Sequence, residues 1–160
     1  MTDDEYRRIV ETYGDIVYRV ALSYSKSAQD AEDVLQNTFM KLLLKNPVLK
    51  SEEHLRNWLI RVAVNECKDL AFSFWRKKVD LLEEEKQEIT FDSAAEIDLY
   101  DALMQLPRKY RIIIHLFYYE GYTTKEIAGI LHIRETAVRT RLVRARKQLK
   151  QMLKEEWENE

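Results

Sequence analysis

Apolar residues recur every three or four positions along most of this chain, which is the spacing of helices that bury one face. In the first half, three long segments carry this pattern, at residues 3–25, 28–45 and 54–77. Pro47 ends the second segment, because proline restricts the residue before it and cannot continue a helix. We therefore expect three packed helices in this half, with a loop at residues 46–53 between the second and the third.

The second half has the pattern of a helix-turn-helix. A helix is predicted after Pro107, and Gly121 is expected to end it in a left-handed conformation. Thr123 and Glu126 then stand at the spacing of a capping box, which begins a short helix. After a turn, a longer helix is predicted from about Arg134. Its apolar stripe consists of Val138, Leu142, Ala145 and Leu149.

The outer face of this longer helix is strongly basic. The cations of the segment are Arg134, Arg139, Arg141, Arg144, Arg146, Lys147 and Lys150. One acidic residue, Glu135, stands among them, and Thr140 and Val143 share the face that points away from the core. A positive helix of this shape suits the phosphates and the major groove of DNA. The alternative is a solvated basic helix, but the preceding capped helix and turn favour DNA binding.

A second polar stripe runs along the predicted helix at residues 54–77. Its members, three or four positions apart, are His54, Asn57, Arg61, Asn65 and Lys68. These side-chain types suit hydrogen bonds to bases and phosphates, especially beside a loop that could hold an unstacked base. Taken alone, the stripe is more typical of a solvated helix face.

Composition and charge indicate an all-α protein of two small domains. Of the 160 residues, 46% are hydrophobic and 34% are charged, with three glycines and two prolines. Residues 79–101 carry nine acidic residues and one lysine, whereas residues 102–160 carry twelve basic and seven acidic residues. We therefore expect helical domains at residues 1–78 and 99–160, joined by an acidic, flexible linker at residues 79–98.

The sequence disfavours several functional classes. The single cysteine, Cys67, excludes an internal disulfide framework and fits a reducing cytoplasm, and the chain shows neither a signal-peptide pattern nor a membrane-spanning run. Three scattered histidines, with no zinc-binding set, phosphate loop or nucleophile elbow, argue against an enzyme, a metal site or a cofactor. Tyr118, Tyr119 and Tyr122 could form a stacking platform, but at helical spacing they are expected to be packing residues.

At this point the residues resemble a known family. The matching strings are DAEDVLQNTFMKLL, NWLIRVAVNECKDL, LPRKYRIIIHLFYYEGYTTKEIAGIL and ETAVRTRLVRARKQL, in order along nearly the whole chain. They resemble the extracytoplasmic-function (ECF) sigma factors, two-domain bacterial initiation factors that give RNA polymerase its promoter specificity. The resemblance implies that the chain binds core RNA polymerase and promoter DNA, assists promoter melting, and has an inhibitory anti-sigma partner.

The resemblance also implies a role for each surface. The residues that match the docking face for core polymerase are Asp33, Gln36, Asn37 and Met40. The loop at 46–53 matches the region that captures the minus-ten element, where one non-template base is flipped into a pocket. The helix residues that match this region are His54, Asn57, Arg61 and Asn65. Those that match the face reading the minus-thirty-five element are Arg139, Thr140, Val143 and Arg144, and those nearer to phosphates are Arg134, Arg141 and Arg146. The acidic linker is similar to segments that thread the RNA-exit path of the polymerase.

Two other functions remain open from the sequence. A stand-alone helix-turn-helix regulator would act through the C-terminal module and would need a dimer surface and a defined half-site spacing, and the sequence indicates neither. An adaptor that binds another protein through its helices would explain an exposed Asp33 and Gln36, but it leaves the basic helix without a role.

Overall fold

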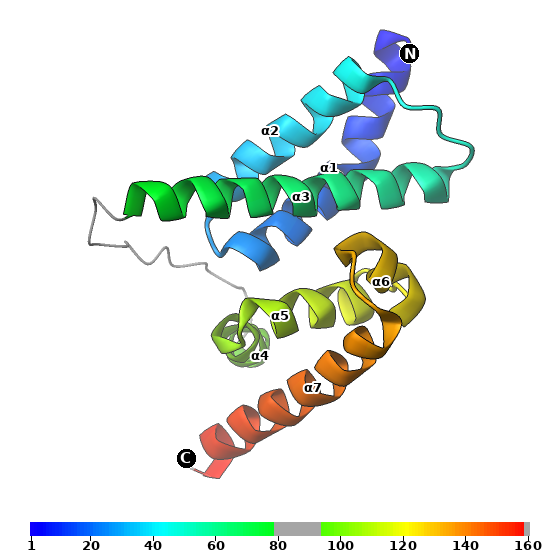
Figure 1. Ribbon diagram of the computed structural model, residues 1–160. Coiled ribbons are helices and arrows are strands. Elements are labelled where there is room, and N and C mark those ends of the chain that lie inside the picture. Colours follow the sequence, from blue (N-terminus) through cyan, green and yellow to red (C-terminus); the bar gives the residue numbers. More distant parts are fainter. Residues whose placement is uncertain (79–93, 159–160) are drawn as a thin grey trace. The chain divides into compact units, whose positions relative to one another are not determined.

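The computed structural model describes residues 1–78 and 94–158, and every regular element within those ranges is helical (Figure 1). The elements are α1 (Asp3–Ser25), α2 (Ala28–Lys45), α3 (Glu52–Lys78), α4 (Ala94–Gln105), α5 (Arg108–Ile114), the π-helical segment η1 (His115–Tyr119), α6 (Thr124–Leu131) and α7 (Glu135–Glu158). The chain folds into two compact units, Met1–Gln87 (unit 1) and Glu88–Glu160 (unit 2). The all-α fold class expected from the sequence is confirmed.

In unit 1, α1, α2 and α3 all pack against one another, with α3 crossing the other two helices (Figure 1). Both α1 and α2 have the predicted bounds, because capping side chains fix where they start. Thr2 caps α1, and at the start of α2 the Ser27 hydroxyl accepts a hydrogen bond from the Asp30 amide at 3.2 Å. The large, fully buried side chains of unit 1 are Val17, Val20, Val34, Leu42, Leu59, Ile60 and Val64.

The third helix begins earlier than the sequence pattern indicated. It starts at Glu52 rather than at His54, so the predicted loop at 46–53 was too long. The Ser51 hydroxyl accepts a hydrogen bond from the His54 amide at 3.0 Å and caps the helix. Two acidic residues then stand in the first turn, where the helix dipole favours negative charge. The connection between α2 and α3 is therefore residues 46–51.

The first described helix of unit 2, α4, begins at Ala94, so the last residues assigned to the acidic linker are helical. The remainder of the predicted linker, residues 79–93, lies outside the described residues. As expected, α5 begins directly after Pro107, and Gly121 adopts a left-handed conformation with a φ of 74°. The π-helical turn η1 between them is a feature that the apolar periodicity did not indicate.

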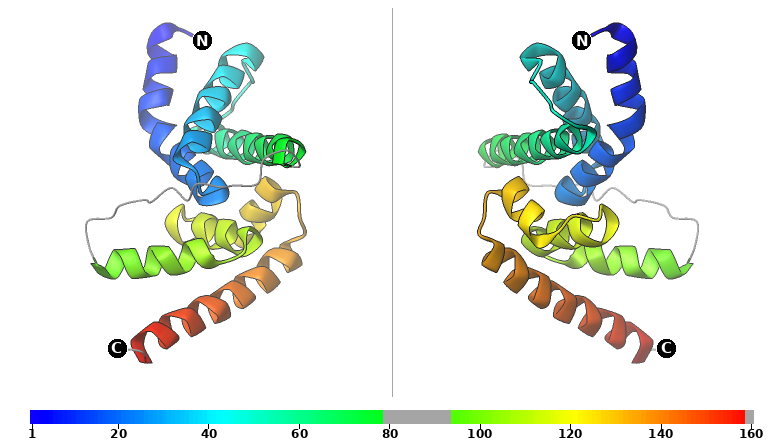
Figure 2. Two further views of the ribbon diagram at one scale, coloured as in Figure 1. Left: turned by 90° about the vertical axis from the view of Figure 1, so that its left-hand side faces the viewer. Right: turned by 90° about the vertical axis from the view of Figure 1, so that its right-hand side faces the viewer.

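The predicted helix-turn-helix is confirmed in unit 2, where α7 leaves the turn in a new direction from α6 (Figure 2). Thr123 and Glu126 form the expected capping box, with two hydrogen bonds of 3.1 Å each. His132 ends α6 in a left-handed conformation with a φ of 56°. The apolar side chains that α6 and α7 bury are Ile127, Ile130, Leu131, Val138, Leu142 and Ala145. The opposite face of α7 is thereby directed to solvent.

Candidate interfaces for DNA and for a protein partner

The outward face of α7 carries most of the residues expected to meet DNA. Those exposed to solvent are Arg134, Arg139, Thr140, Val143, Arg144 and Arg146, while Arg141 is half-buried. Arg134, Thr140, Arg141 and Arg144 border a shallow depression of about 460 Å³ at the turn and the start of α7. Val143 is 61% exposed. An apolar side chain among cations suits contact with a thymine methyl group.

The carboxylate of Glu135 orients the start of this face. Its Oε1 accepts hydrogen bonds from Arg139 Nη2 at 2.8 Å and from Thr124 Oγ1 at 3.0 Å. Because Thr124 begins α6, Glu135 joins the first turns of the two helices of the motif. The spacing of Glu135 and Arg139 was visible in the sequence, but the contact with Thr124 crosses the turn and had no local signal.

Arg146 is held by a different element, the π-helical turn η1. Its Nε donates a hydrogen bond to the Tyr118 hydroxyl, and its guanidinium lies 5.6 Å from the Phe117 ring centre and 5.4 Å from that of Tyr118. The expectation that the tyrosines are packing residues is correct for Tyr122, which is buried. Tyr118 and Tyr119 are each 54% exposed and therefore lie outside the core, although Tyr118 contacts Arg146 and Tyr119 stacks on the His115 ring.

The residues expected to dock on a polymerase share the solvent-facing side of α2. Asp33, Gln36, Asn37 and Met40 are all exposed, and Met40 is 54% exposed. An exposed methionine beside acidic and amide groups is typical of a protein-binding surface.

A buried carboxylate on α3 anchors one edge of that α2 surface. Glu66 is 7% exposed, and its Oε2 accepts a hydrogen bond from Asn37 Nδ2 at 3.4 Å. Its Oε1 forms an ion pair with Lys41 Nζ. No local pattern in the sequence identifies this residue, because Glu66 stands far from both Asn37 and Lys41 along the chain.

The polar stripe on α3 is divided between exposed and half-buried side chains. His54 and Arg61 are exposed, whereas Asn57 and Asn65 are half-buried. The His54 ring lies against the preceding connection, because its Nδ1 accepts a hydrogen bond from the Lys50 amide at 3.3 Å. The Asn57 Oδ1 is buried, and no donor from the described residues reaches it, so a base contact through this oxygen would require the side chain to turn.

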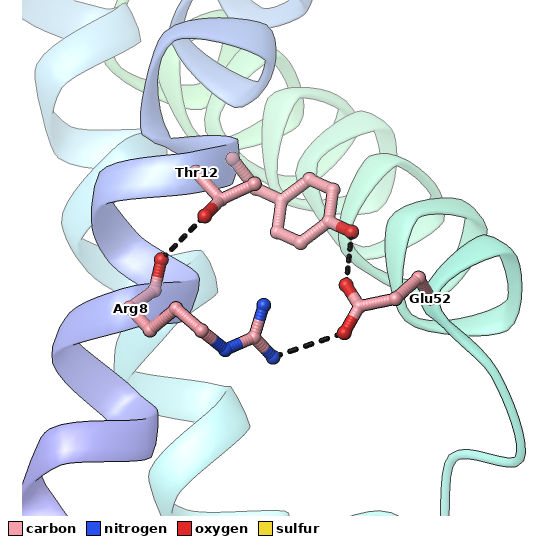
Figure 3. A network of polar contacts seen from close by, with 4 residues as sticks. Arg8, Thr12 and Glu52 are labelled. Carbon is pink, nitrogen blue, oxygen red and sulfur yellow. Dashed lines mark hydrogen bonds and ion pairs between the residues drawn. The ribbon is translucent and has the colours of Figure 1, made fainter.

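Two residues of α1 reach the first residue of α3 (Figure 3). Arg8 Nη2 lies 3.0 Å from Glu52 Oε1, and the Tyr13 hydroxyl donates a hydrogen bond to Glu52 Oε2. The bond from Tyr13, followed by that from Arg8, lowers the pKa of Glu52 below its ordinary value of 4.5. Burial, and then the neighbouring carboxylate, raises the pKa of Tyr13.

Two further features bear on the type of site. Within residues 1–78 and 94–158, His, Cys, Asp and Glu side chains nowhere gather in threes that could hold a metal ion. Among the helices that the structure describes, none combines the length and the apolar character needed to cross a membrane.

Both units match known protein families. Residues 9–78 match the family Sigma-70 region 2, and residues 96–149 match the family Sigma-70, region 4. The RNA polymerase sigma factor SigV of Bacillus subtilis is 32% identical over 143 residues, covering 87% of this chain and 85% of that protein. The ECF RNA polymerase sigma factor SigM of the same organism is 32% identical over 160 residues, covering 94% of each.

Solved structures agree with the fold. The sigma factor RpoE of Bartonella quintana, in complex with the anti-sigma factor NepR, has a TM-score of 0.82 at 24% identity, covering 94% of this chain and 97% of that one. CnrH in complex with the cytosolic domain of CnrY has a TM-score of 0.68 at 25% identity, covering 96% of this chain and 90% of that one.

Proposed function

The chain belongs to the ECF RNA polymerase sigma factors. On that premise we propose which of its surfaces binds the polymerase and which bind the two promoter elements. As a sigma factor it directs core RNA polymerase to promoters. Such a role requires binding and DNA distortion and no catalytic residue of its own, and we infer that it acts in the cytoplasm with the polymerase. The observation that carries the proposal is the exposed basic face of α7 in a helix-turn-helix, in the same chain as the exposed docking face of α2.

In this proposal, unit 1 binds the polymerase through α2. The docking residues are Asp33, Gln36, Asn37 and Met40, and their common exposure on one helix supports the assignment. A protein partner that masks this face would silence the chain. CnrH was solved with the cytosolic domain of CnrY, and RpoE with the anti-sigma factor NepR, and we infer that an anti-sigma protein also binds this chain.

Unit 1 also captures the minus-ten element through α3 and the connection at residues 46–51. The residues assigned to this task are His54, Asn57, Arg61 and Asn65. Unstacking a base costs a few kcal/mol. Two interactions offset this cost: the binding of the chain to the polymerase, and contacts of Arg61 with the DNA backbone. Both hold the DNA close to the residues that receive the base.

Unit 2 reads the minus-thirty-five element with α7 in the major groove. The base-reading residues are Arg139, Thr140, Val143 and Arg144, and the residues nearer to phosphates are Arg134, Arg141 and Arg146. A stand-alone regulator would use unit 2 alone and leaves the α2 face without a partner, so the sigma-factor function is favoured.

The direct test is run-off transcription on genomic DNA with reconstituted core polymerase, followed by mapping of the start sites. We expect specific transcripts when chain and core polymerase are combined and none with either alone. Tight binding of the chain alone to a palindromic site would instead favour the stand-alone regulator.

Polymerase docking is tested by replacing Asp33 and Gln36 together with alanine. Recovery of the chain on immobilised core polymerase should fall at least about tenfold, while helical content is unchanged. The matched control is Asp15→Ala, which removes an exposed carboxylate from α1. Equal recovery of the double variant and the control would exclude the α2 face as the docking surface.

A further inference from the structure

The network that joins α1 to the start of α3 lies next to the connection that the proposed function assigns to minus-ten capture. Arg8 and Tyr13 both contact Glu52, so both carboxylate oxygens are occupied and the direction of the carboxylate is set (Figure 3). The Tyr13 side chain is buried, at 7% exposure, and is therefore fixed to the core of unit 1. Through Tyr13, the first turn of α3 is tied directly to that core.

The connection at residues 46–51 is held mainly at its two ends. At the first end, the Asn46 amide donates a hydrogen bond to the Leu42 carbonyl at 3.1 Å, and Asn46 has a left-handed φ of 38°. At the second end lie Ser51 and the Glu52 network. Val48 between them is 86% exposed. The position of the second end therefore sets where the connection lies relative to His54 and the rest of α3.

We propose that Arg8, Tyr13 and Glu52 are positioning residues for minus-ten capture. They hold the start of α3, and with it the connection at 46–51, in the geometry that receives an unstacked base. This proposal rests on the assignment of the minus-ten element to α3, and it adds residues of α1 that the assignment did not include.

Exposure of the network favours positioning over a contribution to folding. The side chains of Arg8 and Glu52 remain 52% and 62% exposed, and exposed ion pairs contribute little to stability. Such a pair can still fix the orientation of a carboxylate when that carboxylate also bonds to an anchored side chain. Here the anchor is the buried ring of Tyr13, and the element that it directs begins at Glu52.

The test uses the full chain with core polymerase on a promoter identified by run-off mapping. The variants are Tyr13→Phe, which removes the hydroxyl, and Glu52→Gln, which removes the charge. The matched control is Thr12→Ala, because the Thr12 hydroxyl donates to the Arg8 carbonyl within α1 at 2.7 Å and does not contact Glu52 (Figure 3). Melting is followed by the permanganate reactivity of unpaired thymines, and selectivity by the ratio of transcription on the preferred and on a singly substituted minus-ten sequence.

We expect Tyr13→Phe and Glu52→Gln to lower both melting and the selectivity ratio by about three- to tenfold, which is the range expected for loss of one ordinary, solvent-exposed hydrogen bond. Polymerase affinity should match that of Thr12→Ala, and the thermal midpoint at neutral pH should fall only by the small amount that an exposed ion pair contributes. Arg8→Lys should retain most of the selectivity that Arg8→Ala loses, because it keeps a cation near the same oxygen.

Two results would overturn the proposal. One is an unchanged selectivity ratio in both Tyr13→Phe and Glu52→Gln. The other is a loss of melting that merely parallels a loss of polymerase affinity and thermal stability, since the network would then be structural. Failure of the minus-ten assignment itself is seen separately, as an unchanged ratio in the variants His54→Ala and Arg61→Ala.

Discussion

Replacing Glu66 with alanine should lower the free energy of unfolding of unit 1 by about 1–2 kcal/mol. Glu66 is buried on α3 and joins two residues of α2, accepting a hydrogen bond from Asn37 and pairing with Lys41. Alanine removes both contacts at once. The loss of unfolding free energy therefore measures how strongly α2, the proposed docking helix, is held to α3.

The magnitude follows from the exposure of each partner. Hydrogen bonds to charged groups are worth about 1.5–3 kcal/mol when the group is desolvated. The Lys41 side chain is 38% exposed, compared with 10% for Glu66, and Asn37 faces solvent, so both partners can be hydrated once the carboxylate is gone. No buried charge is left unpaired, and the loss stays well below the 3–5 kcal/mol seen when it is.

The assay is a double-mutant cycle of Glu66→Ala and Lys41→Ala, with urea and thermal unfolding. We expect a coupling energy of about 1 kcal/mol and, for Glu66→Ala, a thermal midpoint lowered by roughly 5–15 °C. Glu66→Gln keeps an acceptor for Asn37 and should lose about half as much stability. Lys68→Ala is the matched control, since it removes an exposed lysine two residues along α3. A coupling energy below about 0.3 kcal/mol would refute the argument, because the two residues would then act independently.

Further predictions concern the DNA face and the dependence on pH. Arg144→Ala should reduce the binding free energy by about 1–3 kcal/mol at one promoter position, whereas Arg146→Ala should weaken binding to all sequences and reduce the salt slope by about one. Binding titrations on single-base variants of the promoter separate the two effects. Equal losses of affinity on every sequence for both variants would contradict the assignment of Arg144 to a base and Arg146 to a phosphate. Glu135→Gln removes the carboxylate beside Arg139, so non-specific affinity should rise and base selectivity fall, and an unchanged ratio of the two affinities would contradict this. Because the pKa of Glu52 is lowered from 4.5, its stabilising effect is fully present above about pH 4.5 and is lost as the pH falls through the lower folded value. Acid unfolding of Glu52→Gln should therefore converge with that of the parent chain at low pH, and a constant difference would exclude the linkage.

The features that could be predicted from the sequence are those whose causes lie within a few residues. The bounds of α1 and α2 follow from apolar periodicity and from caps such as Ser27, which bonds an amide three residues away. The capping box at Thr123 is equally local, and so is the left-handed Gly121. A periodic pattern also identifies which face of α7 is outward, because one turn of helix fixes the direction of the next.

The features that could not be predicted depend on residues that are distant in the sequence. Nothing near Glu66 indicates that it meets Lys41, and nothing near Arg8 indicates that it meets Glu52. The start of α3 is a separate case, because the Ser51 hydroxyl caps the helix through an amide only three residues away, whereas the ion pairs of Glu66 and Glu52 have no local signal. Tertiary packing decides such contacts, and periodicity carries no information about which helix a polar side chain will face.

Contacts with residues outside α7 also change how its basic face should be interpreted. The arginines of α7 have the same charge, but they differ in the side chains that they contact. Arg139 is paired with a carboxylate, so its charge is partly cancelled while its direction is fixed. Arg146 is held by the neutral Tyr118 and therefore keeps its full charge for phosphates. Among the described residues, the side chain of Arg144 forms no such bond, so it loses more freedom on binding, and a matching base must compensate for that loss. On this argument Arg139 contributes direction, Arg146 contributes charge, and Arg144 contributes the dependence on sequence.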